Sequence, residues 1–188
     1  MKSVEIVGFK RANLGKSSSK ALRDKAEVPC VLYGGKEQVH FAVPMYLFRS
    51  IVYTPDAHIV DLNVEGKKYQ AILQDIQFHP VNDIILHADF LELHADKEVK
   101  IEVPVKVTGN SVGVSKGGKL VQRLRKVKVS ALPANLPDYV TINVADLDLG
   151  KTIKVSAIET NNYRILNPSA VPVVTIEIPR ALKNAAKG

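Results

Sequence analysis

The chain has 188 residues, of which 46% are hydrophobic and 24% charged, and its formal net charge is +7 at pH 7. This composition excludes a wholly disordered chain, and the length allows one large domain or two small ones. The longest apolar run falls far short of the roughly 18 residues that a membrane-spanning helix needs, and the N-terminus lacks the apolar stretch of a signal peptide. The single cysteine excludes an intrachain disulfide. We therefore expect a cytoplasmic protein with no membrane contact.

The basic side chains are unevenly distributed along the chain. Residues 1–25 contain seven basic and two acidic side chains, whereas residues 26–95 contain four and nine. Residues 96–188 contain 15 basic and eight acidic side chains, so this half supplies the whole net charge. Clustering of this kind suits a defined polyanionic partner, although a solvated basic face is sufficient to explain the charge alone.

The chain begins with a predicted strand at residues 4–9, followed by a polar segment and a short helix at about 17–27. Serines suit the N-cap of this helix, because a hydroxyl can accept from the free amides of the first turn. One side of the helix gathers cations and a serine: Lys16, Ser19, Lys20 and Arg23. The opposite side is small and apolar, with Ala21, Leu22 and Ala26. We expect the apolar side to pack on the protein and the other side to present its cations.

Strands and one further helix are predicted over the rest of the first half. Strands are expected at residues 28–33, 39–43, 60–64, 69–73 and 84–93. Pro44 can open a helix that ends before Pro55 and turns these side chains inward: Met45, Leu47, Phe48 and Ile51. In the last strand, His87 and Asp89 project from the same side because side chains alternate along a strand.

The pattern changes after His94. Apolar residues alternate cleanly over 99–107 and again over 127–129, and later strands are expected at 139–144, 152–157 and 171–178. Helical periodicity is almost absent. We therefore predict a mainly β protein with a few short helices, divided into a domain at 1–95 and an all-β domain at 96–188 with a basic tail from residue 180.

Several residues could carry chemistry, but each has a plainer interpretation. The tripeptide at 15–17, Gly-Lys-Ser, resembles the end of a phosphate loop, but that motif needs a glycine at position 10, where Lys10 stands, and the strands that follow suggest antiparallel pairing. Cys30 lies in an apolar run that predicts a core residue and not a nucleophile. The five histidines include no pair at helical ligand spacing, so we predict no metal site and no cofactor.

Two polar groups remain open to more than one interpretation. The pair His87 and Asp89 could act in acid–base chemistry, bind a metal, or lie solvated on a strand, and it could also bind base edges and 2′-hydroxyls in the wide minor groove of RNA. The run from Lys116 to Lys128 holds six basic residues in 13 and no acid. We expect it to be a basic loop that enters a strand, and such a strand buries its apolar residues and aligns cations on one side, either for solvent or for RNA or an acidic protein.

Short motifs of the first half share their order and spacing with one known family: Gly15-Lys16, Leu22-Arg23, VPCVLYGGK at 28–36, QDIQFHP at 74–80 and HADF at 87–90. In these motifs the chain resembles the L-twenty-five family of bacterial large-subunit ribosomal proteins. Motifs of the second half are similar to the long, two-domain Ctc (general stress protein) form: IEVPV at 101–105, residues 109–113, 117–118, 131–133 and 136–137, and LDLG at 147–150. The resemblance extends over residues 4–178.

This resemblance implies a first domain that is a small β-barrel, similar to the anticodon-binding domain of glutaminyl-tRNA synthetase. It implies binding to the loop E region of 5S ribosomal RNA through a minor groove. Carried over by position, the RNA contacts are Arg11, Lys16, Ser19, Lys20, Arg23, Tyr33, Gln74, His87 and Asp89. Many members have two arginines where this chain has Lys20-Ala21, and a lysine lacks the two-pronged guanidinium.

The expected function is therefore binding without catalysis, as a monomer within the large ribosomal subunit. Cations of the first 25 residues would contact phosphates, while Tyr33, Gln74, His87 and Asp89 would supply specific contacts. Three alternatives remain at this point. The first is a tRNA-binding or other RNA-binding stress factor that uses the same domain, and the second is a nucleotide-dependent enzyme. The third is a protein-interaction factor that uses the second domain.

Overall fold

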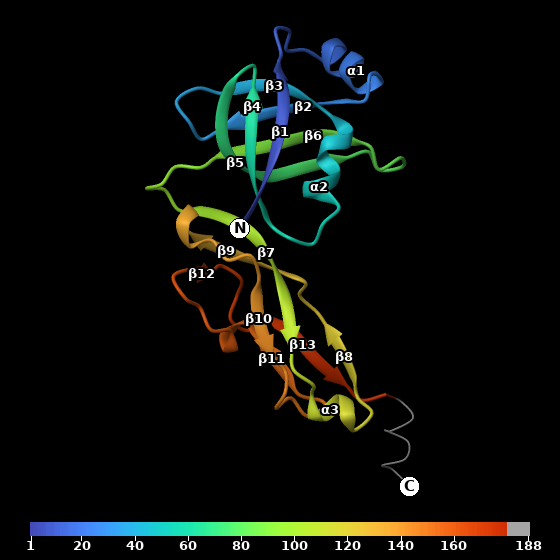
Figure 1. Cartoon of the computed structure of the whole chain (residues 1–188). Coiled ribbons are helices and arrows are strands. Elements are labelled where there is room, and N and C mark those ends of the chain that lie inside the picture. The colour runs from blue at the N-terminus through green and yellow to red at the C-terminus, as the bar shows by residue number, and fades with distance from the viewer. Residues whose placement is uncertain (180–188) are drawn as a thin grey trace. The chain divides into compact units, whose positions relative to one another are not determined.

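A computed structural model of the chain describes residues 1–179, which form two compact units joined along the chain (Figure 1). The first unit comprises Met1–Ile101 together with Leu132–Asp138, and the second comprises Glu102–Ala131 and the chain from Tyr139 onward. A mainly β fold with a few short helices was predicted and is confirmed. Within residues 1–179 no helix is long and apolar enough to cross a membrane.

A closed six-stranded barrel forms the first unit. Its strands are β1 (Lys2–Lys10), β2 (Glu27–Tyr33), β3 (Val39–Pro44), β4 (His58–Val64), β5 (Lys67–Phe78) and β6 (Ile85–Glu92). They close in the order β1-β3-β2-β6-β5-β4. The pairs β1–β4 and β2–β6 are parallel, which corrects the expectation of antiparallel pairing. The alternation of apolar and polar residues along a strand indicates which face of the strand is buried. It does not indicate whether the neighbouring strand runs parallel or antiparallel.

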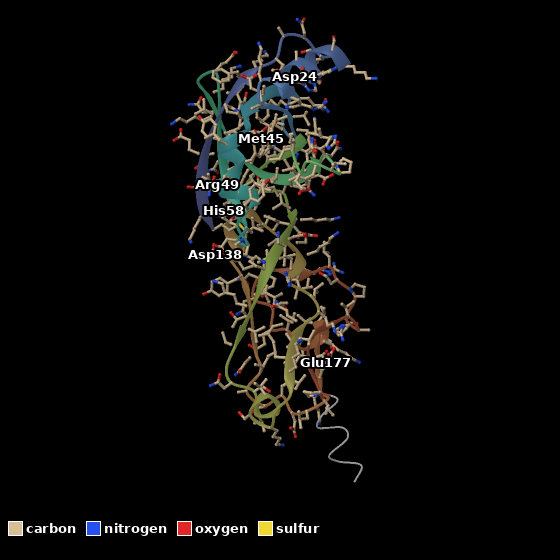
Figure 2. All side chains as sticks on the ribbon, turned by 90° about the vertical axis from the view of Figure 1, so that its right-hand side faces the viewer. Asp24, Met45, Arg49, His58, Asp138 and Glu177 are labelled. Atoms are coloured by element: carbon tan, nitrogen blue, oxygen red, sulfur yellow. The ribbon has the colours of Figure 1, made fainter. Side chains whose placement is uncertain are left out.

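Aromatic side chains fill the centre of the barrel. The ring of Phe90 lies 5.7 Å from that of Phe41 and 6.3 Å from that of Phe48, measured between centroids, and all three are fully buried. Phe48 ends a 3₁₀ turn, η1 (Met45–Phe48), which continues into the short helix α2 (Arg49–Val52). This segment lies beside the barrel (Figure 2) and was predicted as one helix. Its inward residue Ile51 is buried as expected.

Helix α1 (Lys16–Asp24) begins earlier than the serine pattern suggested. Its N-cap is Gly15 and no side chain caps the first turn, so the predicted serine cap is wrong. The reason is that Ser19 is already inside the helix, where its hydroxyl donates to the carbonyl of Gly15 at 3.0 Å. The helix ends at Asp24 because Ala26 adopts a left-handed conformation (φ 59°) that starts β2.

The face of α1 that meets the barrel also differs from the prediction. Its half-buried residues are Ser18, Ser19, Leu22 and Arg23. Ala21 and Ala26, which were expected to pack, are exposed. Two small alanines bury too little apolar area to orient a nine-residue helix, whereas a serine and an arginine that form hydrogen bonds to the barrel can do so.

A segment from the middle of the chain returns to the first unit. Leu136 is buried, and Asp138 forms an ion pair with the amino group of Met1 at 3.1 Å. A fragment of residues 1–95 would lack both contacts, so the predicted boundary of the first domain stays a prediction.

Two sheets make up the second unit. The strands are β7 (Val99–Thr108, whose first three residues belong to the first unit), β8 (Lys119–Gln122), β9 (Lys126–Ala131), β10 (Val140–Asn143), β11 (Thr152–Lys154), β12 (Arg164–Ile165) and β13 (Pro172–Glu177). One sheet has the order β10-β7-β9-β12 and the other the order β11-β13-β8. Helical segments are single turns: α3 (Val112–Ser115), η2 (Pro133–Asn135, within the first unit) and η3 (Val155–Ala157). The predicted tail from residue 180 lies outside the described residues.

The basic run at 116–128 is divided between the two sheets. Residues 116–118 form a turn, residues 119–122 belong to β8 and residues 126–128 to β9, so the predicted loop is followed by parts of two strands and not of one. Three of its cations pair with acids that are distant in sequence: Lys116 with Asp148 (2.9 Å), Lys128 with Glu102 (3.8 Å) and Arg123 with Glu177. The hydrogen bond from Lys116 lowers the pKa of the Asp148 carboxyl. The run therefore has acidic neighbours in space although it has none in sequence.

Gly8 in β1 faces the barrel core, where a side chain would not fit. A Cβ atom there would lie 2.6 Å from Cδ2 of Phe41, whose ring packs on Phe90. We expect Gly8→Ala to lower the free energy of unfolding by about 1–3 kcal/mol, as overpacking typically does. Urea unfolding measures this change. The control Gly15→Ala, with no atom within 4 Å of its Cβ, should cost less than about 1 kcal/mol; equal losses would contradict the packing argument.

Candidate nucleic-acid interface

A row of outward-facing residues, three of them polar, crosses four barrel strands. In β2 the buried residues Cys30 and Leu32 alternate with Val31 and Tyr33, which therefore face outward. The register pairs Val31 with His40 of β3 and with Asp89 of β6. Asp89 in turn lies opposite Asp75 of β5. Residues 40, 31, 89 and 75 thus form one row, which we call the barrel row.

His87 and Asp89 form a hydrogen-bonded pair on this face. Nδ1 of His87 lies 2.8 Å from Oδ1 of Asp89, and their side chains are 31% and 30% exposed. Because an ionised carboxylate can only accept, Nδ1 carries the hydrogen and donates it to Asp89. Gln77 of β5 lies opposite His87. The hydrogen bond therefore fixes the orientation of the Asp89 carboxylate, which is an acceptor, and it joins two side chains that the sequence placed on one side of the strand.

Tyr33 and Gln74 lie next to the barrel row. Tyr33 ends β2, and its phenol has a raised pKa because of burial, with further contributions from the charges of Asp89 and Asp75. The phenol therefore stays neutral and can donate a hydrogen bond. Gln74 is exposed in β5, at an irregularity between Leu73 and Asp75. Such a bulge turns a side chain away from the regular alternation.

Arg11 connects the end of β1 to helix α1. Its Nη2 donates to the hydroxyl of Ser19 at 3.0 Å and to the carbonyl of Asn13 at 3.4 Å. Its backbone amide donates to the carbonyl of His40 at 2.9 Å. Two of the predicted contact residues, Arg11 and Ser19, are therefore bonded to each other and hold α1 at one end of the barrel row.

Arg23 fixes the other side of the helix. Its Nε donates to the carbonyl of Leu86 at 3.0 Å, one residue before His87. Lys16 and Lys20 are exposed on α1. The helix thus brings its cations beside the polar face of β2 and β6, with two arginines bound to the barrel and two lysines in solvent.

Three residues of this face were not singled out from the sequence: His40, Asp75 and Gln77. The alternation of β5 could have identified Asp75 and Gln77 as neighbours on one side. His40 could not be found in this way, because only the register of β3 with β2 brings it beside Val31.

His79, which had no role in the sequence interpretation, organises the turn after β5. Its Nδ1 accepts from the backbone amides of Val81 and Asn82 at 3.3 Å each. Its own amide donates to the carbonyl of Ile84 at 2.7 Å. The imidazole thus acts as an internal cap for the hairpin that joins the two strands of the interface.

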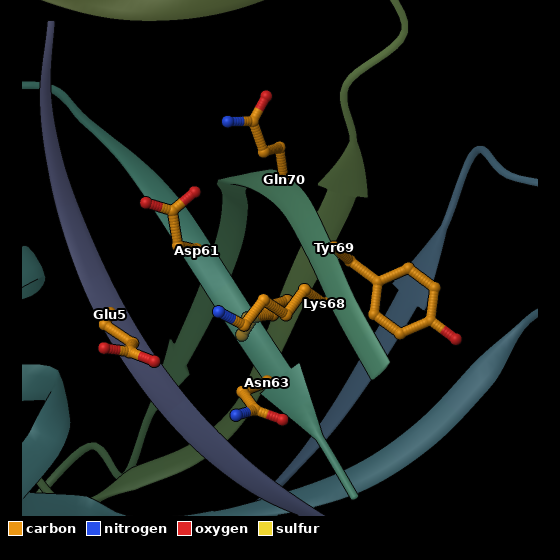
Figure 3. A pocket seen from close by; sticks show the side chains of 7 residues that line it. Glu5, Asp61, Asn63, Lys68, Tyr69 and Gln70 are labelled. Carbon is orange, nitrogen blue, oxygen red and sulfur yellow. The ribbon is translucent and has the colours of Figure 1, made fainter. Parts of the chain in front are cut away.

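A second polar face lies on β1, β4 and β5 (Figure 3). It is a shallow pocket of about 300 Å³ whose lining includes Glu5, Asp61, Asn63, Lys68 and Gln70. Glu5 lies opposite Asp61 in the register of β1 with β4. Two carboxylates against one ammonium make this face unsuitable for phosphates, and none of the predicted contact residues lies on it.

Comparison with known proteins connects this geometry to a family. Residues 6–90 match the Ribosomal L25p family, and residues 98–180 match the C-terminal domain of ribosomal protein TL5. The chain is 55% identical over 97% of its length to large ribosomal subunit protein bL25 of Cytophaga hutchinsonii, covering 95% of that protein. The bL25 protein of Amoebophilus asiaticus is 50% identical over 99% of the chain (95% of that protein), and that of Bacteroides fragilis 45% identical over 99% (97% of that protein). The chain belongs to the Ribosomal L25p family. The resemblance to the long, two-domain form is confirmed, because both family regions are present.

The one cysteine of this L25p chain lies in the barrel core. Cys30 is 1% exposed, and burial raises the pKa of its thiol, with the cation of Arg11 acting against this and the charge of Asp89 reinforcing it. The thiol therefore stays protonated and behaves as a core residue, as predicted. Among residues 1–179, no three His, Cys, Asp or Glu side chains gather in a group that could hold a metal ion.

The burial of Cys30 can be tested with a thiol reagent. Because the thiol is inside the barrel core, we expect labelling in native buffer to be at least about a hundredfold slower than in urea, as access requires opening of the barrel. Rapid labelling of the native chain would contradict the described packing of β2. The chain has no other cysteine, so the signal has one source.

The bond between Arg11 and Ser19 should control the stability of α1. We expect Arg11→Gln to accelerate amide hydrogen exchange in residues 16–24 by about fivefold, since a hydrogen bond of this kind contributes about 1 kcal/mol. Exchange in β4 should not change. Lys16→Gln is the matched control, because Lys16 is exposed on the same helix. Similar acceleration in both variants would show that charge alone, and not the bond, holds the helix.

Proposed function

We propose that this chain is a constituent of the large ribosomal subunit and binds 5S ribosomal RNA with α1 and the outer face of β2 and β6. The observation that carries the proposal is the hydrogen bond from Arg23 of α1 to the carbonyl of Leu86, which anchors this cationic helix one residue from the hydrogen-bonded pair His87–Asp89. The relatives that are similar over the whole chain are named large ribosomal subunit proteins. The specific partner follows from the motif resemblance, whose contact residues largely gather on this one side of the barrel.

The cations of α1 would supply affinity and orientation. Lys16 and Lys20 are exposed and can reach phosphates without losing any bond to the protein. Arg11 and Arg23 already bond to the protein through one nitrogen each, so their guanidinium groups are held in place. A guanidinium has five N–H donors; Nε of Arg11 is buried, but the other unused donors of the two groups can bind phosphate oxygens from a preorganised position. Phosphate contacts of this kind set register but carry no sequence information.

The acids on the barrel row would supply selectivity. Carboxylates repel phosphates, so Asp75 and Asp89 weaken any general attraction of this face to a polyanion. An acid is useful against RNA where it accepts from a base, and the wide minor groove of A-form RNA presents amino groups and 2′-hydroxyls. His87 holds Asp89 at a fixed orientation, and Tyr33 adds a neutral hydroxyl. The face thus combines nonspecific cations at its edge with directed acceptors at its centre.

Two substitutions should separate these contributions in the full chain. Lys16→Ala should weaken binding to 5S RNA and reduce the slope of log affinity against log salt by somewhat under about one unit, as loss of one phosphate contact requires. Asp89→Asn removes a negative charge yet should weaken binding by about tenfold, because a charge-assisted hydrogen bond to a base is lost. Filter binding over a series of salt concentrations measures both effects.

The controls lie on the second polar face. Lys68→Ala and Asp61→Asn make the same charge changes on β5 and β4. They should leave the affinity for 5S RNA within about twofold, since salt screens the interaction between the RNA and exposed charges far from it. Tighter binding by Asp89→Asn would show a purely electrostatic surface and reject the specific role. If tRNA competes as well as 5S RNA for the parent chain, the partner is a different RNA and the proposal fails.

A further inference from the structure

The second unit carries an array of cations that no single segment of the sequence contains. In β9, Lys126 and Lys128 alternate with the fully buried Val127 and Val129. Both lysines therefore face outward from the four-stranded sheet, about 7 Å apart as alternate residues of a strand are. They are exposed. This outward surface of β10, β7, β9 and β12 is called the sheet face below.

The neighbouring strands add their charges to the same surface. Nζ of Lys128 lies 3.8 Å from Oε1 of Glu102 in β7, so these residues share one side of the sheet. Lys106 lies four residues after Glu102 in the same strand and therefore also faces outward. On the other side of β9, Arg164 of β12 lies opposite Ser130, which has the same orientation as Lys128.

An aromatic ring stands at the edge of the sheet face. Nζ of Lys106 lies 3.8 Å from the centroid of the Tyr139 ring, and Tyr139 is 46% exposed. The following outward residues of β10 are Thr141 and Asn143, whose register partners in β7 are Lys106 and Thr108. The exposed outward residues of these strands are thus cations, hydroxyls, an amide and one aromatic ring, with Glu102 as the one acid among them.

We propose that the sheet face is a second RNA-binding surface, which contacts the phosphate backbone of helical RNA through Lys106, Lys126, Lys128 and Arg164. Cations on three neighbouring strands, spaced by about 5 Å between strands and about 7 Å along them, suit a polyanion with many charges better than one small anion. The proposal does not depend on the 5S RNA site, because the sheet face contains none of those residues.

The composition favours RNA over an acidic protein. A stable protein interface has a core of buried apolar side chains, and depletes lysine there. The sheet face has lysines at its centre and its aromatic ring at the edge strand β10. Nucleic-acid interfaces are strongly basic and use hydroxyl and amide groups on sugar and phosphate oxygens. Mutual repulsion between the cations is only partly offset by one exposed acid, and a polyanion would relieve it.

Matched triple variants of the full chain can test this surface. The probe is an RNA duplex of about 20 base pairs with no internal loop. Changing Lys106, Lys126 and Lys128 together to glutamine should reduce the salt slope of binding by about two units, as loss of up to three phosphate contacts requires. The control changes Lys119, Lys151 and Lys154 to glutamine; these exposed lysines flank or belong to the other sheet. This control variant loses the same charge as the first triple variant and should change the salt slope of binding by less than about half a unit. If the two triple variants change the slope equally, only the net charge of the protein matters for duplex binding, and the proposal is wrong.

A variant that is expected to bind RNA more tightly tests the proposal without the risk that misfolding explains the result. Glu102→Gln removes the acid of the sheet face and releases Lys128, so we expect it to tighten duplex binding by about threefold at low salt. An inactive or unfolded variant cannot produce that result. Unchanged or weaker binding by a folded Glu102→Gln chain contradicts the proposal. If the first triple instead lowers affinity for polyglutamate and leaves the duplex unaffected, the surface serves an acidic protein and not RNA.

Discussion

Strand β2 pairs in parallel with β6, in a register that puts Cys30 opposite Ala88 and Val31 opposite Asp89. Everything on the candidate interface depends on this pairing. The buried partners Cys30, Ala88 and Phe90 hold the two strands on the core. Because side chains alternate, the same register turns Asp89 outward. A slip of one residue would bury a carboxylate and expose the aromatic core, which costs far more than the marginal stability of a small domain.

Helix α1 shows how structural and binding roles are combined in the same residues. A nine-residue helix with no buried side chain has little stability of its own. Hydrogen bonds from Arg11 to Ser19 and from Arg23 to Leu86 hold it on the barrel. Each arginine keeps donors that the protein does not use. In the proposed complex, these two arginines are already held on the barrel before RNA binds, which lowers the entropic cost of binding.

The second unit follows a different arrangement. Its local basic run is partly neutralised by Asp148, Glu177 and Glu102, all of which are distant in sequence. The sheet face combines Lys126 and Lys128 of this run with cations from two distant strands, Lys106 of β7 and Arg164 of β12. A cluster of charges along this sequence therefore does not correspond to a cluster of charges in space, because neighbouring strands come from distant segments of the chain.

The sequence alone was sufficient for the mainly β class, for most strands and for the motifs that relate the chain to its family. These depend on short-range properties: alternation in β4 and β9, the turn after β2, and residues at fixed spacing such as His87 and Asp89. The serine cap of α1 was predicted incorrectly, and so was the direction of two of the six strand pairs of the barrel, β1–β4 and β2–β6. The tertiary structure alone decided the parallel pairings, the orientation of α1 and the presence of His40 in the barrel row. The physical reason is that backbone hydrogen bonds between strands are nearly independent of side-chain identity. Register and direction are set by how the buried faces of the whole barrel fit together, and no local pattern contains that information.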